Sequence, residues 1–184
     1  MRVERLRAAY QIGVKYTHFP LHPDTPEEGL TLEQLFAGRD IDIPAAKTRM
    51  ARLMADESLD YGDRTMTYNS RLAQELAKWA ETQPGGDAIH DALFRAYFVD
   101  GLNIAVGDTL VGVAEQVGLA KGEAREVLDS RRFKDAVDAD WQRSRELGVT
   151  GVPTFVAGNQ VVVGAQTYEV LETLVVEAGA DLRH

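Results

Sequence analysis

Side chains that could carry out chemistry are sparse in this sequence of 184 residues. It contains no cysteine, which excludes structural disulfides, cysteine-ligated zinc and a thiolate nucleophile. His18 and His22, with Asp24 close by, are the candidate metal ligands. Pro20 and Pro23 disrupt any regular face between them, and no fourth ligand follows at a telling spacing. We therefore expect no metal site, but a half-buried strand histidine and a loop histidine.

Other polar candidates have structural explanations. His90 lies among apolar residues in an early helical turn, which is typical of a packed core histidine. Ser70 or Asn69 is suited to cap the helix that follows. The Gly85-Gly86 pair is predicted to form a turn rather than a phosphate-binding loop, because no strand leads through it into a helix with the required spacing.

Composition narrows the function classes. A net charge of −9 without blocks of Lys and Arg argues against nucleic-acid binding. No apolar run approaches the length of a membrane span, and the first residues are too polar for a signal peptide. We expect a cytoplasmic protein with no membrane partner.

The stretch from residue 148 to residue 163 organises the chain. Two β-rich runs, Thr154–Ala157 and Gln160–Val163, flank Gly158-Asn159, a pair that tolerates the positive φ of a hairpin turn. Pro153 precedes the first strand, where its missing N–H costs no ladder bond. The bond before it is a candidate for the cis isomer. From the residues alone, Pro153 either starts a strand or belongs to a binding site.

The other elements enclose a long helical block. Residues 2–10 are predicted to be a helix and residues 11–19 an alternating strand, with a final helix at 167–178. In the strand, Lys15, Thr17 and Phe19 share one face, while the opposite face carries Ile12, Val14, Tyr16 and His18. Residues 31–147 read as helices with short breaks.

Helix starts in this block have recognisable caps. Thr31 and Gln34 form a capping-box pattern, and Asp42 precedes a proline suited to a first helical turn. Asp108 is predicted to cap a further helix. In the helix opened by Asp87, Phe94 and Phe98 lie opposite a second apolar face, so we expect that helix to be buried on two sides.

These residues carry a resemblance to a known family. Thr150-Gly151-Val152-Pro153-Thr154-Phe155, a hairpin and a final helix resemble the cis-proline end of thioredoxin-fold proteins of the DsbA family, in particular its FrnE-like cytoplasmic branch. The loop from Phe19 to Gly29 is similar to the same family, as are the Leu93–Phe98 and Asn103-Ile104 segments.

The resemblance implies an α/β, thioredoxin-like fold with an inserted all-helical domain. Residues 1–29 and 148–184 would form the incomplete thioredoxin-like domain, and residues 30–147 the inserted one. In the family, the backbone before the cis-proline binds an extended peptide or thiol substrate. The implied substrate-binding residues are Thr150, Gly151, Val152 and Pro153, with Val152 N–H and C=O pairing to an added strand.

The resemblance also implies missing parts. The family's first strand and its Cys-x-x-Cys motif would both fall before Met1, so we expect the native gene to start upstream. The strand is central in the family, between residues 12–19 and 154–157. Without it two sheet edges are unpaired. An element donated by a second chain, or closure of the two half-sheets on each other, would also provide hydrogen-bond partners for these edges. We expect this form of the protein to associate as a homodimer.

The implied function is that of a FrnE-like thiol–disulfide oxidoreductase, inactive in dithiol exchange in this cysteine-free form. One alternative is a glutathione-dependent isomerase or transferase of the kappa type, related to hydroxychromene-carboxylate isomerases, with glutathione as cofactor. Its serine would again lie upstream, so Ser70 does not inherit that role. The other is a non-catalytic module that binds a peptide or partner. No catalytic residue or metal ligand is assigned.

Overall fold

The chain forms two compact units in a computed structural model that describes residues 2–183. One, the hairpin unit, comprises residues 1–21 and 140–184, and the other, the helical unit, comprises residues 22–139. Both boundaries between the units lie earlier in the chain than the domain boundaries expected from the sequence, 29/30 and 147/148. The expected domain boundaries remain a prediction. Helix α8 (Lys134–Glu146) begins in the helical unit and ends in the hairpin unit.

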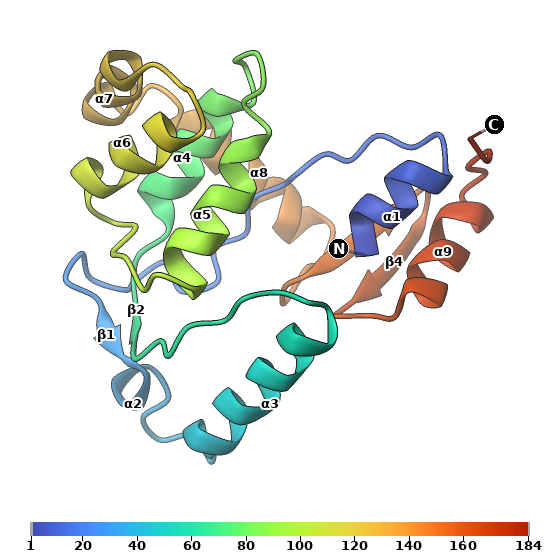
Figure 1. Ribbon diagram of the computed structural model, residues 1–184, viewed down its shortest axis with the longest axis horizontal. Coiled ribbons are helices and arrows are strands. Elements are labelled where there is room, and N and C mark those ends of the chain that lie inside the picture. Colours follow the sequence, from blue (N-terminus) through green and yellow to red (C-terminus); the bar gives the residue numbers. More distant parts are fainter. Residues whose placement is uncertain (1, 184) are drawn as a thin grey trace. The chain divides into compact units, whose positions relative to one another are not determined.

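Packed helices build the core of the helical unit (Figure 1). Helix α4 contributes Leu76 and Trp79 to this core, and both side chains are almost completely buried. Ile89 and Leu110 from the next two helices join them in the same cluster. The elements are β1 (Leu30–Thr31), α2 (Leu32–Leu35), α3 (Ile43–Asp56), β2 (Met66–Thr67), α4 (Arg71–Ala80), α5 (Ala88–Phe98), α6 (Gly107–Gln116) and α7 (Lys121–Ser130).

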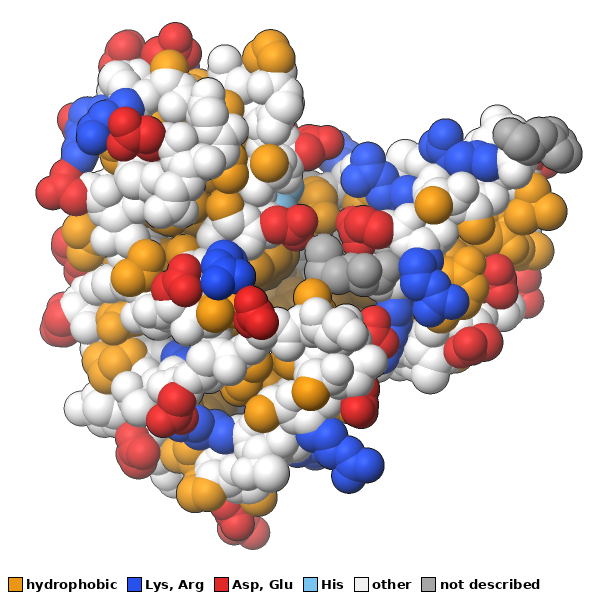
Figure 2. All heavy atoms as spheres, in the orientation of Figure 1, with side chains coloured by type: hydrophobic (Ala, Val, Ile, Leu, Met, Phe, Trp, Pro, Cys, Tyr) orange, Lys and Arg blue, Asp and Glu red, His pale blue; other side chains and the backbone are white. Residues whose placement is uncertain are grey.

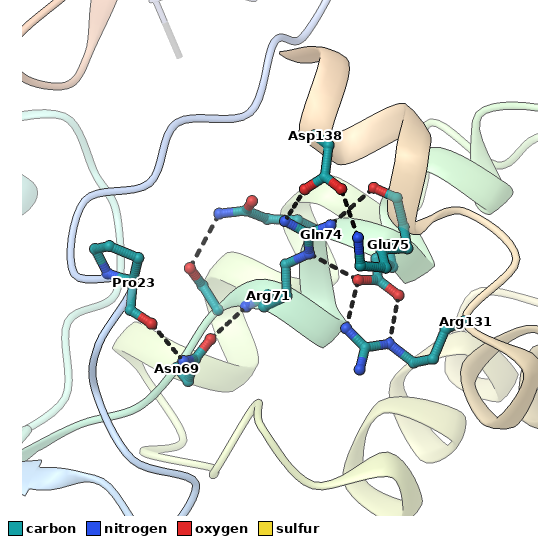
Figure 3. Close-up of polar contacts among 9 residues, drawn as sticks. Pro23, Asn69, Arg71, Gln74, Glu75, Arg131 and Asp138 are labelled. Carbon is teal, nitrogen blue, oxygen red and sulfur yellow. Dashed lines mark hydrogen bonds and ion pairs between the residues drawn. The ribbon is translucent and has the colours of Figure 1, made fainter. Parts of the chain in front are cut away.

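A buried carboxylate ties α4 to the chain that follows α7 (Figure 3). Glu75 is fully buried and accepts hydrogen bonds from Arg71 Nε at 2.7 Å and from Arg131 Nε and Nη2 at 2.8 and 2.7 Å. Burial opposes the charged form, but the hydrogen bonds from Arg131 and Arg71 outweigh it and lower the pKa of Glu75. Hydrogen bonds from Arg71 and Lys134 lower the pKa of Asp138 to about 2.

Helix caps match the sequence in part. The Thr31–Gln34 capping box forms with both reciprocal bonds, and the Asp42 side chain accepts a bond from Ala45 N at 2.9 Å, as predicted. The prediction for Asp108 is wrong: α6 begins one residue before it, and its carboxylate pairs with Arg125 instead.

Other helical features also depart from the sequence-based expectation. Phe94 is 55% exposed, so α5 is not buried on both sides. The segment before α4, which lies within the block expected to be helical with short breaks, contains β2, which pairs antiparallel with β1. Such two-residue strands are too short to give a periodic pattern.

Two glycines allow backbone segments to approach closely in the helical unit. Gly62 N donates to Phe98 O at 2.9 Å, and a Cβ at Gly62 would overlap the carbonyl of Val99. At Gly86, a Cβ would overlap the carbonyl of Ala80, the last residue of α4. Neither position leaves room for a side chain.

The hairpin unit contains strands β3 (Thr154–Ala157) and β4 (Gln160–Val163), with the bounds predicted from sequence. Helices α1 (Arg2–Ala9) and α9 (Tyr168–Glu177) pack together, and α9 contacts β4 (Figure 1). Leu6, Tyr10 and Leu171 form its small buried cluster, with Phe155 packed against it.

Glu172 of α9 joins that helix to Tyr10, the residue that follows α1. Tyr10 and Tyr168 both donate hydrogen bonds to Glu172 Oε1, at 3.0 and 3.1 Å. Partial desolvation of each phenol and the adjacent carboxylate raise the pKa of both tyrosines. Their hydrogen bonds therefore hold the protonated phenols in place.

Residues 11–19 are not a strand, which corrects the sequence-based prediction. A strand requires a hydrogen-bonded neighbour, and in the part of the chain that the structure describes no strand pairs with this segment. Two bonds instead fix it to α8: His18 N donates to Asp140 Oδ2 at 3.1 Å, and Ser144 Oγ donates to His18 O at 3.2 Å.

Surface properties agree with an ordinary acidic protein. Figure 2 shows acidic side chains interspersed with basic and hydrophobic ones on the face drawn. Within residues 2–183, no helix has the length and apolarity needed to cross a membrane.

Candidate functional site

The hairpin leaves one edge of β3 open. Gly164 N donates to Pro153 O at 2.8 Å, which identifies Pro153 and Gly164 as a hydrogen-bonded pair of the antiparallel ladder. Hydrogen-bonded and non-hydrogen-bonded pairs alternate along such a ladder. Thr154 and Val156 are consequently the residues whose N–H and C=O face away from β4, where the described residues form no further strand pairing.

A pocket of about 470 Å³ runs along this open edge. Its β3 side consists of alternate residues, which is the spacing of one face of a strand. Lys15, Thr17 and Phe19, again every second residue, also line the pocket together, as their shared face in the sequence predicted. The remaining lining residues are Val152, Thr154, Val156, Gly158, Val149, Arg143, Ser144 and Leu147.

Charge in this pocket is one-sided. Lys15 and Arg143 contribute two cations, and no carboxylate lines it. Neither side chain forms an ion pair with any of residues 2–183. The hydroxyls of Thr17, Ser144 and Thr154 are the other polar side-chain groups of the lining. The pocket is thus a cationic site in a protein with a net charge of −9.

The four predicted substrate-binding residues lie together at one end of β3. Val152 is 50% exposed and lines the pocket, and the Val152–Pro153 peptide bond is cis. Thr150 and Pro153 are exposed, and Gly151 O accepts a hydrogen bond from Thr154 Oγ1 at 2.7 Å. This bond orders the loop immediately before the strand. Val152 is the one of the four that faces the pocket.

Sequence reasoning missed the charged part of the site. Arg143 belongs to α8 and Lys15 to the segment after α1, and no local pattern connects two cations so far apart in the chain. The alternation of residues 15, 17 and 19 was the available signal. What it could not reveal was the element that this face meets.

Other candidate residues have structural partners. His90 is 6% exposed and its Nε2 lies 3.3 Å from Glu81, which confirms the packed histidine, and burial lowers its pKa. Ser70 precedes α4 without a side-chain cap bond, while Asn69 Oδ1 accepts from Arg71 N at 2.9 Å. Asn69 is therefore the residue that caps. Among residues 2–183, no three metal-ligating side chains gather.

An inserted helical unit and a C-terminal hairpin followed by a helix define a thioredoxin-like protein of the DsbA type. The family model of the DSBA-like thioredoxin domain matches residues 1–176, and the chain belongs to that family. A probable DsbA oxidoreductase from Streptomyces coelicolor has a similar structure, with a TM-score of 0.87 and 28% identity. That similarity covers 96% of this chain and 81% of the other.

Two further proteins are similar. A 2-hydroxychromene-2-carboxylate isomerase has a TM-score of 0.74 over 97% of this chain and 85% of its own, but at 19% identity it supports the fold alone. The uncharacterized protein YwbO of Bacillus subtilis (strain 168) is 31% identical over 102 residues, which are 55% of this chain. The chain spans about half the length of that curated relative, 51%.

Proposed function

We propose that this protein binds an extended peptide or thiol substrate on Thr150, Gly151, Val152 and Pro153, as a FrnE-like member of the DsbA family. The observation that carries the proposal is the exposed Val152 at the end of the open β3 edge. An extended chain that adds to such an edge gains main-chain hydrogen bonds. The family relationship supports a substrate of thiol–disulfide chemistry.

Dithiol exchange by this chain's own residues is not part of the proposal. Exchange proceeds through attack of a thiolate on a disulfide sulfur, and the sequence has no cysteine. We expect the reduction of insulin by dithiothreitol to proceed at its background rate in the presence of the protein. Clear acceleration would contradict this argument.

A peptide titration tests the binding proposal. The probe is a capped hexapeptide of alternating valine and serine, added to ¹⁵N-labelled protein and followed by NMR. We expect the largest shifts at the amides of Val152, Thr154 and Val156. Because a net hydrogen bond is worth about 1 kcal/mol, methylating two backbone nitrogens of the peptide should weaken binding by roughly tenfold or more. Equal affinity of the methylated peptide, or no binding at millimolar concentration, would refute strand addition.

Glutathione is a second candidate ligand, because its carboxylates suit the unpaired Lys15 and Arg143. Saturable glutathione binding that shifts the amides around Pro153 would favour a glutathione-dependent isomerase or transferase of the kappa type. Lys15 and Arg143 would also bind the carboxylates of a glutathione whose thiol is blocked. Binding of glutathione but not of its S-methyl derivative would therefore show that the site recognises the thiol as well.

Self-association is a further part of the proposal. The open edge of β3 would allow two copies to pair as a homodimer, with the cytoplasm as the expected compartment. Light scattering should then give twice the chain mass of 20.3 kDa. A monomer at working concentrations would remove the homodimer and leave peptide binding untouched.

A further inference from the structure

The hairpin has a second edge, on the side of β4 that faces away from β3. The hydrogen-bonded pair of Pro153 and Gly164 fixes which residues of the ladder direct their N–H and C=O outward. On β4 these residues are Val161 and Val163, and within residues 2–183 no further strand pairs with them. Gln166 Nε2 donates to Val163 O at 2.6 Å. The N–H groups of both valines point away from the hairpin.

The outer edge of β4 does not depend on the strand expected upstream of Met1. The family resemblance places that strand between residues 12–19 and β3, where it would cover the β3 edge. β4 borders β3 on the opposite side. An added strand at the expected position would therefore leave the outer edge of β4 as it is.

The side chains of β4 do nothing to block a further strand. Edge strands of natural proteins commonly carry a lysine, another charged residue or a proline that prevents pairing with a second chain. Gln160–Val163 contains none of these. Val161 and Val163 are exposed, and their cross-strand partners Val156 and Thr154 extend the same face. The edge thus combines free backbone groups with an apolar surface.

The distribution of charge favours a second copy of the chain as the added strand. In a two-fold contact the same patch faces itself, so a charged residue near the axis meets a like charge. The protein has a net charge of −9, yet residues 147–168 contain no charged side chain. Glu177 accepts a hydrogen bond from Gln160 Nε2 at 2.8 Å, at the start of β4. The middle of β4 can approach its own copy without an acid in the strand.

We propose that two copies pair antiparallel through β4 and join their hairpins into one continuous sheet. The register that uses every outward group opposes Val161 to Val163 of the second copy and places the two-fold axis at Val162. Each such pair would exchange both of its backbone hydrogen bonds, and the valines would pack together on the exposed face. The inference rests on the self-association in the proposed function and moves its contact from β3 to β4.

Two matched proline variants distinguish the edges. Val161→Pro removes an outward N–H of β4, and Val156→Pro removes an outward N–H of β3. Neither N–H belongs to the β3–β4 ladder, and the two valines oppose each other at 50% and 45% exposure. Sedimentation equilibrium should show dimerisation weakened by about tenfold or more in Val161→Pro, because symmetry removes two bonds worth roughly fivefold each. Val156→Pro should leave the dimer unchanged.

A charge pair tests the register. Val161→Glu and Val163→Lys should each weaken self-association, and a mixture of the two should form a heterodimer in which the glutamate faces the lysine. The control is Val161→Glu mixed with Val176→Lys, because Val176 is similarly exposed but lies on α9. That mixture should gain no heterodimer. Equal heterodimer formation in both mixtures would contradict the register.

Hydrogen exchange of the wild type provides a measurement without a variant. As the protein concentration rises, the amides of Val161 and Val163 should exchange more slowly, while those of Thr154 and Val156 should not change. This result decides the matter if circular dichroism shows that either proline variant fails to fold. Slower exchange at Thr154 and Val156 alone would overturn the inference.

The remaining outcomes separate this inference from the proposed function. If Val156→Pro dissociates the dimer and Val161→Pro does not, the contact lies on β3: the inference is overturned and the proposed self-association stands. A wild-type dimer that neither proline affects also overturns the inference. A wild type that is monomeric at every concentration removes both the β4 contact and the homodimer, and leaves peptide binding untouched.

Discussion

Charged side chains have opposite environments in the helical unit and in the hairpin unit. In the helical unit, the Glu75 carboxylate is fully buried and accepts bonds from two arginines of the same unit. In the hairpin unit, Arg143 and Lys15 line a pocket without any acid. A buried carboxylate left without its arginines would cost several kcal/mol, so that network belongs to stability. Exposed cations cost little when unpaired and remain free for a ligand.

Apolar residues on the hairpin strands are likewise more exposed than those in the core of the helical unit. Leu76, Ile89 and Leu110 of the helical unit are 0% exposed, whereas Val161 and Val163 of the hairpin are 50% and 53% exposed. Those valines share a strand face with Thr154 and Val156, since Thr154 is opposite Val163 and Val156 opposite Val161. The helical unit is a closed core, and the hairpin is an open sheet.

The largest effect should come from the buried carboxylate. Glu75→Gln removes the charge of a fully buried carboxylate that accepts hydrogen bonds from Arg71 and Arg131, so the free energy of unfolding should fall by about 3–5 kcal/mol. Urea denaturation followed by circular dichroism measures it. Glu115→Gln is the control, because Glu115 pairs with Lys121 on the surface and should cost at most about 1 kcal/mol. Equal losses of unfolding free energy in the two variants would contradict the difference between the buried and the exposed carboxylate.

A core truncation tests the closed packing of the helical unit. Leu76→Ala creates a cavity around a residue that is 0% exposed, and should cost roughly 3 kcal/mol in the same urea experiment. A cost below about 1 kcal/mol would mean that this core is as loosely packed as the hairpin.

Acid should weaken the helical unit first. The pKa of Asp138 is lowered to about 2 in the folded protein, below its unfolded value, and the pKa of Glu75 is also lowered. The stability from these carboxylates is complete above about pH 5 and is lost as the pH falls toward 2. Because Asp138 is 44% exposed at its side chain, Asp138→Asn should cost about 1 kcal/mol at pH 7 and much less at pH 3. A cost independent of pH would contradict the ion-pair explanation.

Alkali should weaken the hairpin unit first. The pKa values of Tyr10 and Tyr168 are raised, so the stability from their bonds to Glu172 is complete below about pH 10 and is lost as the pH rises through the folded values. Trp79 lies in the helical unit and Trp141 in the hairpin unit, which gives each a fluorescent reporter. In Trp79→Phe and Trp141→Phe variants, the Trp141 signal should change first at high pH. Earlier loss of the Trp79 signal would reverse the assignment.

The smallest effect is expected on the open face of the hairpin. Val163 is 53% exposed, so Val163→Ala should change the free energy of unfolding by no more than about 0.5 kcal/mol. A larger cost in dilute solution would indicate that this face is covered by another copy. Repeating the measurement at ten times the protein concentration distinguishes the two explanations.

Local signals explain what the sequence could predict. The hairpin depends on adjacent residues, and its strands were predicted to the residue. The Thr31–Gln34 capping box was likewise complete within four residues. Glu75 and Arg131 are 56 residues apart, and an acid within a helix gives no sign that it is buried. Residues 11–19 alternate as a strand does, yet alternation fixes only which side chains share a face. Strand pairing depends on a neighbour that the segment itself does not specify.

Gly86 also constrains how the sequence is able to vary over generations. Every codon for glycine begins with GG, and each missense change of one nucleotide introduces a residue with a Cβ. At Gly86 that atom would collide with the carbonyl of Ala80, so each such mutation would force the end of α4 to move. The turn between α4 and α5 therefore cannot accept any single-nucleotide missense change at this position without a shift of its backbone. At the neighbouring Gly85 a Cβ would meet no atom within 4 Å, but its φ of +72° favours glycine there for a different reason, the backbone conformation.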